Sequence, residues 1–188
     1  MQNLTERKAI NRIIKVYKQS DKTGIDWYIN SHELLWNIKY DHANVSYNKV
    51  VGICAALSPM KTWSQNIKIL QDYLKTGKAK HTRVFQEKCD QIMLSDGSKE
   101  SIEAILKGEK IVNFFNNLLD PFGSQAVTID RHAIMIANLK FMSNPQVTKK
   151  QYQLYAQAYR KAAQKLCITP LELQACTWVH WRSVKHLY

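Results

Sequence analysis

The stretch VTIDRHAIMIANL, residues 127–139, places an aspartate and a histidine directly before an apolar run with helical spacing. Asp130 has the residue type and the position of a helix N-cap, whose side chain accepts a hydrogen bond from an amide of the first turn. Capping aspartates are common, so this residue taken alone is best interpreted as structural. Whether it also has a chemical role depends on the rest of the chain.

The rest of the chain has the composition of a helical protein. Its 188 residues include 6 Gly and 4 Pro, and apolar residues recur at helical rather than alternating spacing in most segments. No two segments have the pattern of paired strands. We therefore expect an all-α fold, and the chain length favours a single domain over residues 1–188.

Local signals place the helices along the chain. Capping-box pairs predict that helices begin after Thr62, Thr148 and Thr169. Pro59 and Gly77 mark helix ends, because proline restricts the residue before it and glycine adopts the left-handed conformation readily. The other expected helices cover residues 4–19, 26–40, 47–57, 101–106 and 110–119, and the run after Asp130. Residues 47–57 are so apolar that we expect them to form the buried central helix.

The charge balance favours a polyanionic partner. The chain holds 27 Lys and Arg against 15 Asp and Glu, a net charge of +12, so nucleic acid is the leading partner class. No apolar run reaches the 18 residues that a membrane-spanning helix needs, and the N-terminus lacks the apolar core of a secretion signal. We expect a cytoplasmic protein that acts as a monomer and binds no membrane.

The cysteines and histidines do not have metal-site spacing. The four cysteines are scattered, with no CxxC pair, which favours reduced and buried thiols over a disulfide scaffold. The histidines outside the quoted stretch show no paired ligand spacing either. These residues are Cys54, Cys89, Cys167 and Cys176, and His32, His42, His81, His180 and His186. We expect no metal and no cofactor.

Three segments occur in a meaningful order: AALSPMKTW (residues 55–63), ILKGEKIVNFF (residues 105–115) and VTIDRHA (residues 127–133). In this combination the chain resembles the helix-hairpin-helix DNA glycosylase superfamily, the group of endonuclease III and 8-oxoguanine glycosylase. The resemblance covers about residues 50–139. It implies a two-lobed helical fold, with a helix-hairpin-helix unit and a cleft between the lobes.

The resemblance also implies roles for two residues. The family's hairpin ends in a lysine, which is the Schiff-base nucleophile in members that also cut the strand, and Lys110 aligns with it. The family's catalytic aspartate follows about twenty residues later, and Asp130 lies 20 residues after Lys110. Gly108 aligns with the second hairpin glycine, whereas Leu106 stands in place of the first. The cysteines that hold an iron-sulfur cluster in some members are absent here.

These residue types suit the cleavage of an N-glycosidic bond. Positive charge develops on the sugar, and the carboxylate of Asp130 beside it would stabilise that charge. Lys110 must be neutral to attack the sugar carbon. The target base must leave the duplex, which requires stacking or wedge residues to take its place.

Further residues are assigned to binding and support. Expected DNA contacts are Gly108, Lys107, Lys61, Arg131, Arg182 and Lys185. Expected pocket or wedge residues are Met60, Trp63 and Phe114. His132 and Ser58 are expected to support the site without touching the substrate. Trp178 and Trp181 share a helix face and are interpreted first as packing residues.

Two alternatives to base excision remain open. The same segments, together with QACTWVHWR (residues 174–182), are similar to a divergent phage-type branch of the superfamily. One such branch, the α-glutamyl/putrescinyl thymine pyrophosphorylase-like proteins, is associated with thymine hypermodification, which implies displacement of a leaving group on a modified base in the host cytoplasm. The other alternative is a DNA-binding or inhibitory module that keeps the fold without catalysis, and the missing hairpin glycine favours it slightly.

Overall fold

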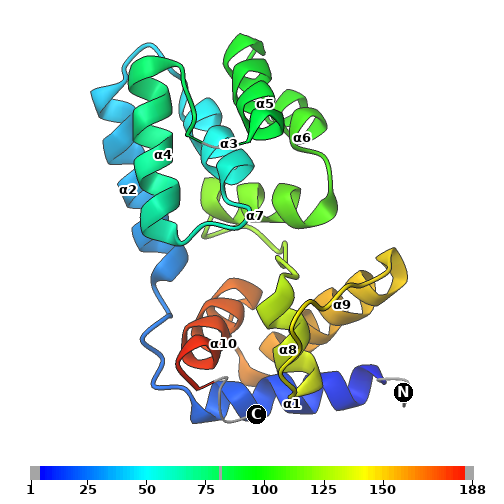
Figure 1. Cartoon of the computed structure of the whole chain (residues 1–188). Coiled ribbons are helices and arrows are strands. Elements are labelled where there is room, and N and C mark those ends of the chain that lie inside the picture. Colours follow the sequence, from blue (N-terminus) through cyan, green and yellow to red (C-terminus); the bar gives the residue numbers. More distant parts are fainter. Residues whose placement is uncertain (1–4, 81, 185–188) are drawn as a thin grey trace. The chain divides into compact units, whose positions relative to one another are not determined.

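A computed structural model of the chain describes residues 5–80 and 82–184, and in these ranges every regular element is a helix (Figure 1). The elements are α1 (Glu6–Gln19), α2 (Trp27–Asp41), α3 (Tyr47–Leu57), α4 (Trp63–Thr76), α5 (Arg83–Leu94), α6 (Lys99–Leu106), α7 (Glu109–Leu119), α8 (Arg131–Asn138), α9 (Lys149–Leu166) and α10 (Pro170–Val184). The all-α expectation is confirmed. No helix within the described ranges combines the length and apolarity needed to cross a bilayer.

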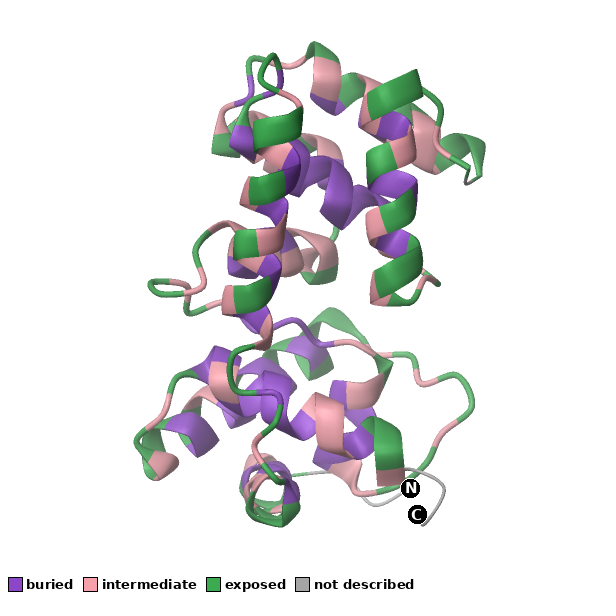
Figure 2. Cartoon of the chain, turned by 90° about the vertical axis from the view of Figure 1, so that its left-hand side faces the viewer, coloured by how far each residue is buried: buried purple, intermediate pink, exposed green. Residues whose placement is uncertain are grey.

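The chain divides into two compact units. Unit 1 combines Met1–Ile29 with Pro121–Tyr188, and unit 2 is Asn30–Asp120. Unit 1 is therefore built from both ends of the chain, and unit 2 is a single continuous insertion into it. Figure 2 shows that each unit has its own buried interior.

In unit 1, α8 is the central helix. Five consecutive residues of α8, Ala133 to Ala137, are buried, and α1, α9 and α10 pack around it. Trp181 and Tyr159 are fully buried in the same core, so the packing role expected for Trp181 is confirmed. The apolar run that follows Asp130 in the sequence is thus the hydrophobic centre of this unit.

In unit 2, α3 has the central position that its composition predicts. All its residues from Val50 to Leu57 are buried, and α4, α5, α6 and α7 pack against it. Gly52 permits a close approach of α6, because a Cβ atom there would lie 2.7 Å from the Cγ2 atom of Ile102. Helix α3 ends at Leu57, with Ser58 as its C-cap.

The capping signals are confirmed. Thr62 and Thr148 form capping boxes with the residues three positions on, and Thr169 exchanges hydrogen bonds with Glu172 in the same way. Gly77 ends α4 in the left-handed conformation, with φ of +69°. These signals act over three or four residues, and tertiary packing does not displace them.

The differences from the expected elements concern weakly signalled ends. Helix α5 was not anticipated; its N-cap, Thr82, makes no side-chain capping hydrogen bond. Helix α6 begins at Lys99, two residues earlier than expected, because Ser98 caps it. Leu4, His81, Lys185 and His186 lie outside the described residues.

Candidate functional site

Asp130 lies at the start of α8 in unit 1 and is partly exposed. Its Oδ1 atom accepts a hydrogen bond of 2.8 Å from the Ala133 amide, so the predicted capping role is confirmed. Its Oδ2 atom accepts a second hydrogen bond of 3.2 Å from the indole Nε1 of Trp178 in α10. Two groups from different helices therefore fix the orientation of this carboxylate.

The segment before Asp130 belongs to no helix or strand and is held by side chains. The Thr128 amide donates to Oε1 of Gln174 at 3.1 Å, and Nε2 of Gln174 donates to the Thr128 carbonyl. The Ile129 amide donates to the Tyr152 hydroxyl at 3.1 Å, and that hydroxyl donates to the Val127 carbonyl at 3.0 Å. All four hydrogen bonds are buried. They satisfy buried backbone groups of a segment that has no neighbouring strand, and the Thr128 carbonyl also accepts a hydrogen bond of 3.0 Å from the Asp130 amide.

The side chain of Trp178 connects Asp130 to other aromatic and cationic groups. The guanidinium of Arg182 lies 4.6 Å from the centroid of the Trp178 ring, in a cation–π contact. The rings of Trp27 and His132 lie with their centroids 6.0 and 6.1 Å from that of Trp178. Trp178 is only partly buried, so its packing role is accompanied by direct contact with the carboxylate.

Tyr159 of α9 adds a neutral hydroxyl to this neighbourhood. Burial raises the pKa of Tyr159, and the negative charge of Asp130 acts in the same direction. The hydroxyl therefore keeps its proton at any physiological pH.

The connection between α6 and α7 in unit 2 is two residues long. Lys107 has φ of +51° and ψ of 151°, and Gly108 has φ of +79° and ψ of 123°. A side chain is disfavoured in both conformations, so Lys107 occupies a position that favours glycine. Leu106, which aligns with the lost hairpin glycine, is instead the fully buried last residue of α6.

The start of α7 is open. Gly108 is its N-cap and makes no side-chain capping hydrogen bond, and a Cβ atom at this position would meet nothing within 4 Å. Lys107 and Lys110 are both exposed on either side of it. Helix N-termini attract anions through their amides and their partial positive charge.

The loop between α3 and α4 forms a tight turn. The Lys61 amide donates to the Ser58 carbonyl at 3.3 Å, which places Pro59 second and Met60 third in the turn. Met60 has φ of +64° and is 81% exposed. Glycine or asparagine is usual where the third turn residue has positive φ, so an exposed methionine here is unusual in both conformation and polarity.

The predicted site residues fall into two groups, one in each unit. Unit 1 holds Asp130, Arg131, His132 and Arg182. Unit 2 holds Ser58, Met60, Lys61, Trp63, Lys107, Gly108, Lys110 and Phe114. In the first group, Arg182 and His132 lie against the ring of Trp178, whose indole donates to Asp130. In the second group, Ser58 caps α3 through its hydroxyl. The convergence of Lys110 and Asp130 on one nucleotide remains a prediction.

Sequence reasoning missed Gln174 and Tyr152. The one available signal was a glutamine between apolar residues in LQAC, residues 173–176. Among the described residues, no group of three His, Cys, Asp or Glu is placed to hold a metal ion.

The comparisons with curated proteins and with solved structures each found no significant match. A family model matches residues 1–185, and its description is a family of unknown function, DUF7178. Because the match spans nearly the whole chain, the protein belongs to the DUF7178 family.

Proposed function

We propose that this protein is a DNA glycosylase-like enzyme that extrudes a base from DNA and acts at its glycosidic bond, with Asp130 as the essential carboxylate. The observation that carries the proposal is the double anchoring of that carboxylate by the Ala133 amide and the Trp178 indole. A fixed, partly exposed negative charge stabilises a developing sugar cation without reorganising during the reaction. The clamp formed by Gln174 and Tyr152 holds the backbone that leads to it.

The turn between α6 and α7 is the proposed phosphate contact. An open helix N-terminus with lysines on both sides combines amide donors with positive charge. Lys107 and Gly108 would contact the backbone, and Lys110, in the first turn of α7, is the candidate nucleophile.

Met60 is the proposed wedge. An apolar side chain inserted between base steps replaces the stacking that is lost when a base is extruded. The turn leaves Met60 81% exposed, so that its side chain stands out from unit 2 where a wedge would contact a base step. Lys61 and Trp63 follow directly, and would contact the same stretch of DNA.

The test uses duplexes that carry uracil, hydroxymethyluracil or 8-oxoguanine, or phage DNA with its own modified bases. Strand cleavage by alkali after incubation reveals abasic sites, and borohydride trapping reports on Lys110. Mass spectrometry of the released nucleosides detects the alternative outcome, modification of thymine without excision. No abasic site and no changed nucleoside across these substrates would exclude both enzymatic functions.

Asp130→Asn is the decisive variant, but it needs a matched control. Asparagine caps a helix as well as aspartate does, yet its amide nitrogen would then face the indole N–H of Trp178. The double variant Asp130→Asn, Trp178→Phe removes this conflict between donors. We expect Trp178→Phe alone, which keeps the charge of Asp130 and the Ala133 anchor, to lose much less product formation than the variants that carry Asp130→Asn. Both variants that carry Asp130→Asn should lose product formation by about 10²-fold or more.

One observation favours a second candidate, a DNA-binding module without catalysis. Both oxygens of Asp130 already accept hydrogen bonds within unit 1, as a purely structural aspartate would require. In that case Asp130→Asn with Trp178→Phe binds DNA like the wild type, and no substrate yields a product.

A further inference from the structure

Positive charge is divided unevenly between the two units. Unit 1 contains 15 Lys and Arg against 5 Asp and Glu, a net charge of +10. Unit 2 contains 12 against 10, a net charge of +2. Nearly all of the excess positive charge of the chain therefore belongs to unit 1, although the units are of similar length. An overall tendency toward basic residues would have charged both units alike.

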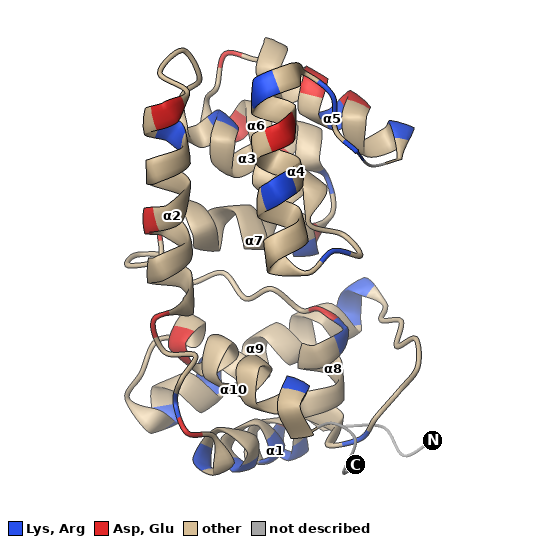
Figure 3. Ribbon diagram, turned by 60° about the vertical axis from the view of Figure 1, so that its left-hand side comes forward, with Lys and Arg blue, Asp and Glu red and all other residues tan. Residues whose placement is uncertain are grey.

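Within unit 1, α1 carries the densest part of this charge. Its cations are Arg7, Lys8, Arg12, Lys15 and Lys18. At 100° per residue they fall within an arc of about 140° on the solvent side of the helix. Arg7 to Lys18 spans about 16 Å at 1.5 Å per residue. Figure 3 shows Lys and Arg gathered along α1.

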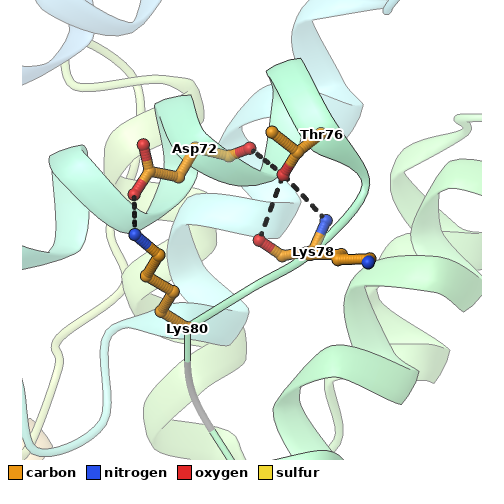
Figure 4. A network of polar contacts seen from close by, with 4 residues as sticks. All are labelled: Asp72, Thr76, Lys78 and Lys80. Carbon is orange, nitrogen blue, oxygen red and sulfur yellow. Dashed lines mark hydrogen bonds and ion pairs between the residues drawn. The ribbon is translucent and has the colours of Figure 1, made fainter.

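These five cations of α1, called the α1 stripe below, are not neutralised by ion pairs with acidic neighbours. The one acidic residue of α1, Glu6, points to the other side of the helix, where it pairs with Lys161 of α9. Among the described residues, none of the five cations forms an ion pair with a carboxylate. Unit 2 differs in this respect, because its Lys80 pairs with Asp72 beside the hydrogen-bonded end of α4 (Figure 4).

We propose that this stripe of α1 binds the phosphate backbone of a nucleic acid duplex, independently of base sequence. Five cations spread over about 16 Å match a rod that carries one charge per ~1.7 Å of axis. A membrane surface fits less well. A basic amphipathic helix binds a bilayer by inserting its apolar face, and that face of α1, formed by Ala9, Ile10, Ile13 and Val16, is buried in the core of unit 1.

This inference rests on the proposed nucleic-acid partner but not on chemistry at Asp130. Contacts with a flipped base hold a single nucleotide in place. The α1 stripe would instead supply binding affinity that depends on the salt concentration. Each phosphate contact adds about 0.9 to the slope of log K against log salt concentration. The contribution of the stripe can therefore be measured on DNA without any target base.

The experiment compares two triple variants of the whole chain that remove the same charge. The first is Arg7→Gln, Lys15→Gln, Lys18→Gln in α1. The control is Lys68→Gln, Lys75→Gln, Lys78→Gln, three exposed lysines in and just after α4 of unit 2. The probe is an unmodified duplex of about 20 base pairs, labelled for fluorescence anisotropy and titrated between about 50 and 200 mM KCl.

We expect the α1 variant to lose about 2.7 from the salt slope and to bind about a hundredfold more weakly at about 100 mM KCl. The salt slope of the control variant should fall by less than about 1. Thermal unfolding should match the wild type for both, because substitutions of exposed residues usually have little effect on stability.

Equal losses in the two variants would mean that only net charge matters, and would overturn the inference. So would an unchanged slope in the α1 variant, or a wild-type chain that does not bind the duplex at the lowest salt concentration. The two proposals fail separately. If no substrate yields a product but the α1 variant alone loses its slope, base chemistry is wrong and the binding surface stands.

Discussion

Gln174 gives the sharpest test of how unit 1 is organised around Asp130. The substitution Gln174→Leu keeps a side chain of similar size but removes both the acceptor and the donor that face Thr128. The Thr128 amide then loses its hydrogen bond to Gln174 in a buried position, whereas the Thr128 carbonyl keeps the hydrogen bond of 3.0 Å that it accepts from the Asp130 amide. The segment that leads to Asp130 thus loses both of its hydrogen bonds to Gln174 and keeps those to Tyr152.

The size of the effect follows from the Thr128 amide. A buried donor whose acceptor is removed costs about 1–3 kcal/mol. A typical domain is stable by only about 5–15 kcal/mol. Loss of this one side chain should therefore remove a measurable part of the stability of unit 1, even though no apolar volume is lost.

Urea unfolding followed by circular dichroism measures this change, with Gln157→Leu as the control because Gln157 is exposed on α9. Gln174→Glu adds a test of mechanism: its ionised carboxylate would repel the Thr128 carbonyl at neutral pH, and protonation would restore a donor. Burial raises the folded pKa of such a carboxyl, so the lost stability should return as the pH falls. A loss below about 1 kcal/mol for Gln174→Leu, or one no larger than the control, would refute the reasoning.

Three other outcomes follow from the backbone and the titrating groups. Lys107→Gly should stabilise the chain by about 1 kcal/mol by relieving a conformation that favours glycine, whereas Lys107→Ala should not; urea unfolding distinguishes them. A thiol reagent should label the exposed Cys167 quickly and the buried Cys89 slowly, since burial raises the pKa of Cys89 to about 12; mass spectrometry over time checks the order. Hydrogen bonds from the Ser98 amide and hydroxyl lower the pKa of Asp96. Asp96→Ala should therefore reduce the melting temperature at neutral pH, and the difference should shrink as the pH falls from about 4 through the lowered pKa of Asp96.

The sequence predicts those parts of the fold that depend on local chemistry. The capping box at Thr62 and the cap at Asp130 involve partners three residues away, so the pattern of residue types suffices to find them. The buried position of α3 follows from its composition, because its residues from Val50 to Leu57 are all small or apolar. Helix α5 has neither signal: its N-cap makes no side-chain hydrogen bond, and only Cys89 and Ile92 are buried along it.

The candidate site was only partly predictable, for a physical reason. Asp130 stands out as a residue, but the groups that hold it come from far along the chain: Trp178 is 48 residues away and Gln174 lies 46 residues from Thr128. Contacts of this range depend on how α8, α9 and α10 pack, and a single sequence does not encode that packing as a periodic pattern. The positive φ of Lys107 could not be predicted from the sequence either, because a lysine does not indicate a backbone conformation that glycine adopts more easily.

The contacts of Asp130 also bear on whether a cap and a catalytic group can be one residue. Capping needs a single acceptor, and asparagine supplies it as well as aspartate. The indole of Trp178 requires a second acceptor on the same side chain, and only a carboxylate provides acceptors at both positions. The indole therefore selects for the charged residue at a place where a cap alone would tolerate a neutral one. Capping and the proposed catalytic role of Asp130 are therefore compatible, because the cap uses Oδ1 and the indole uses Oδ2, and neither contact removes the charge that would stabilise a cation.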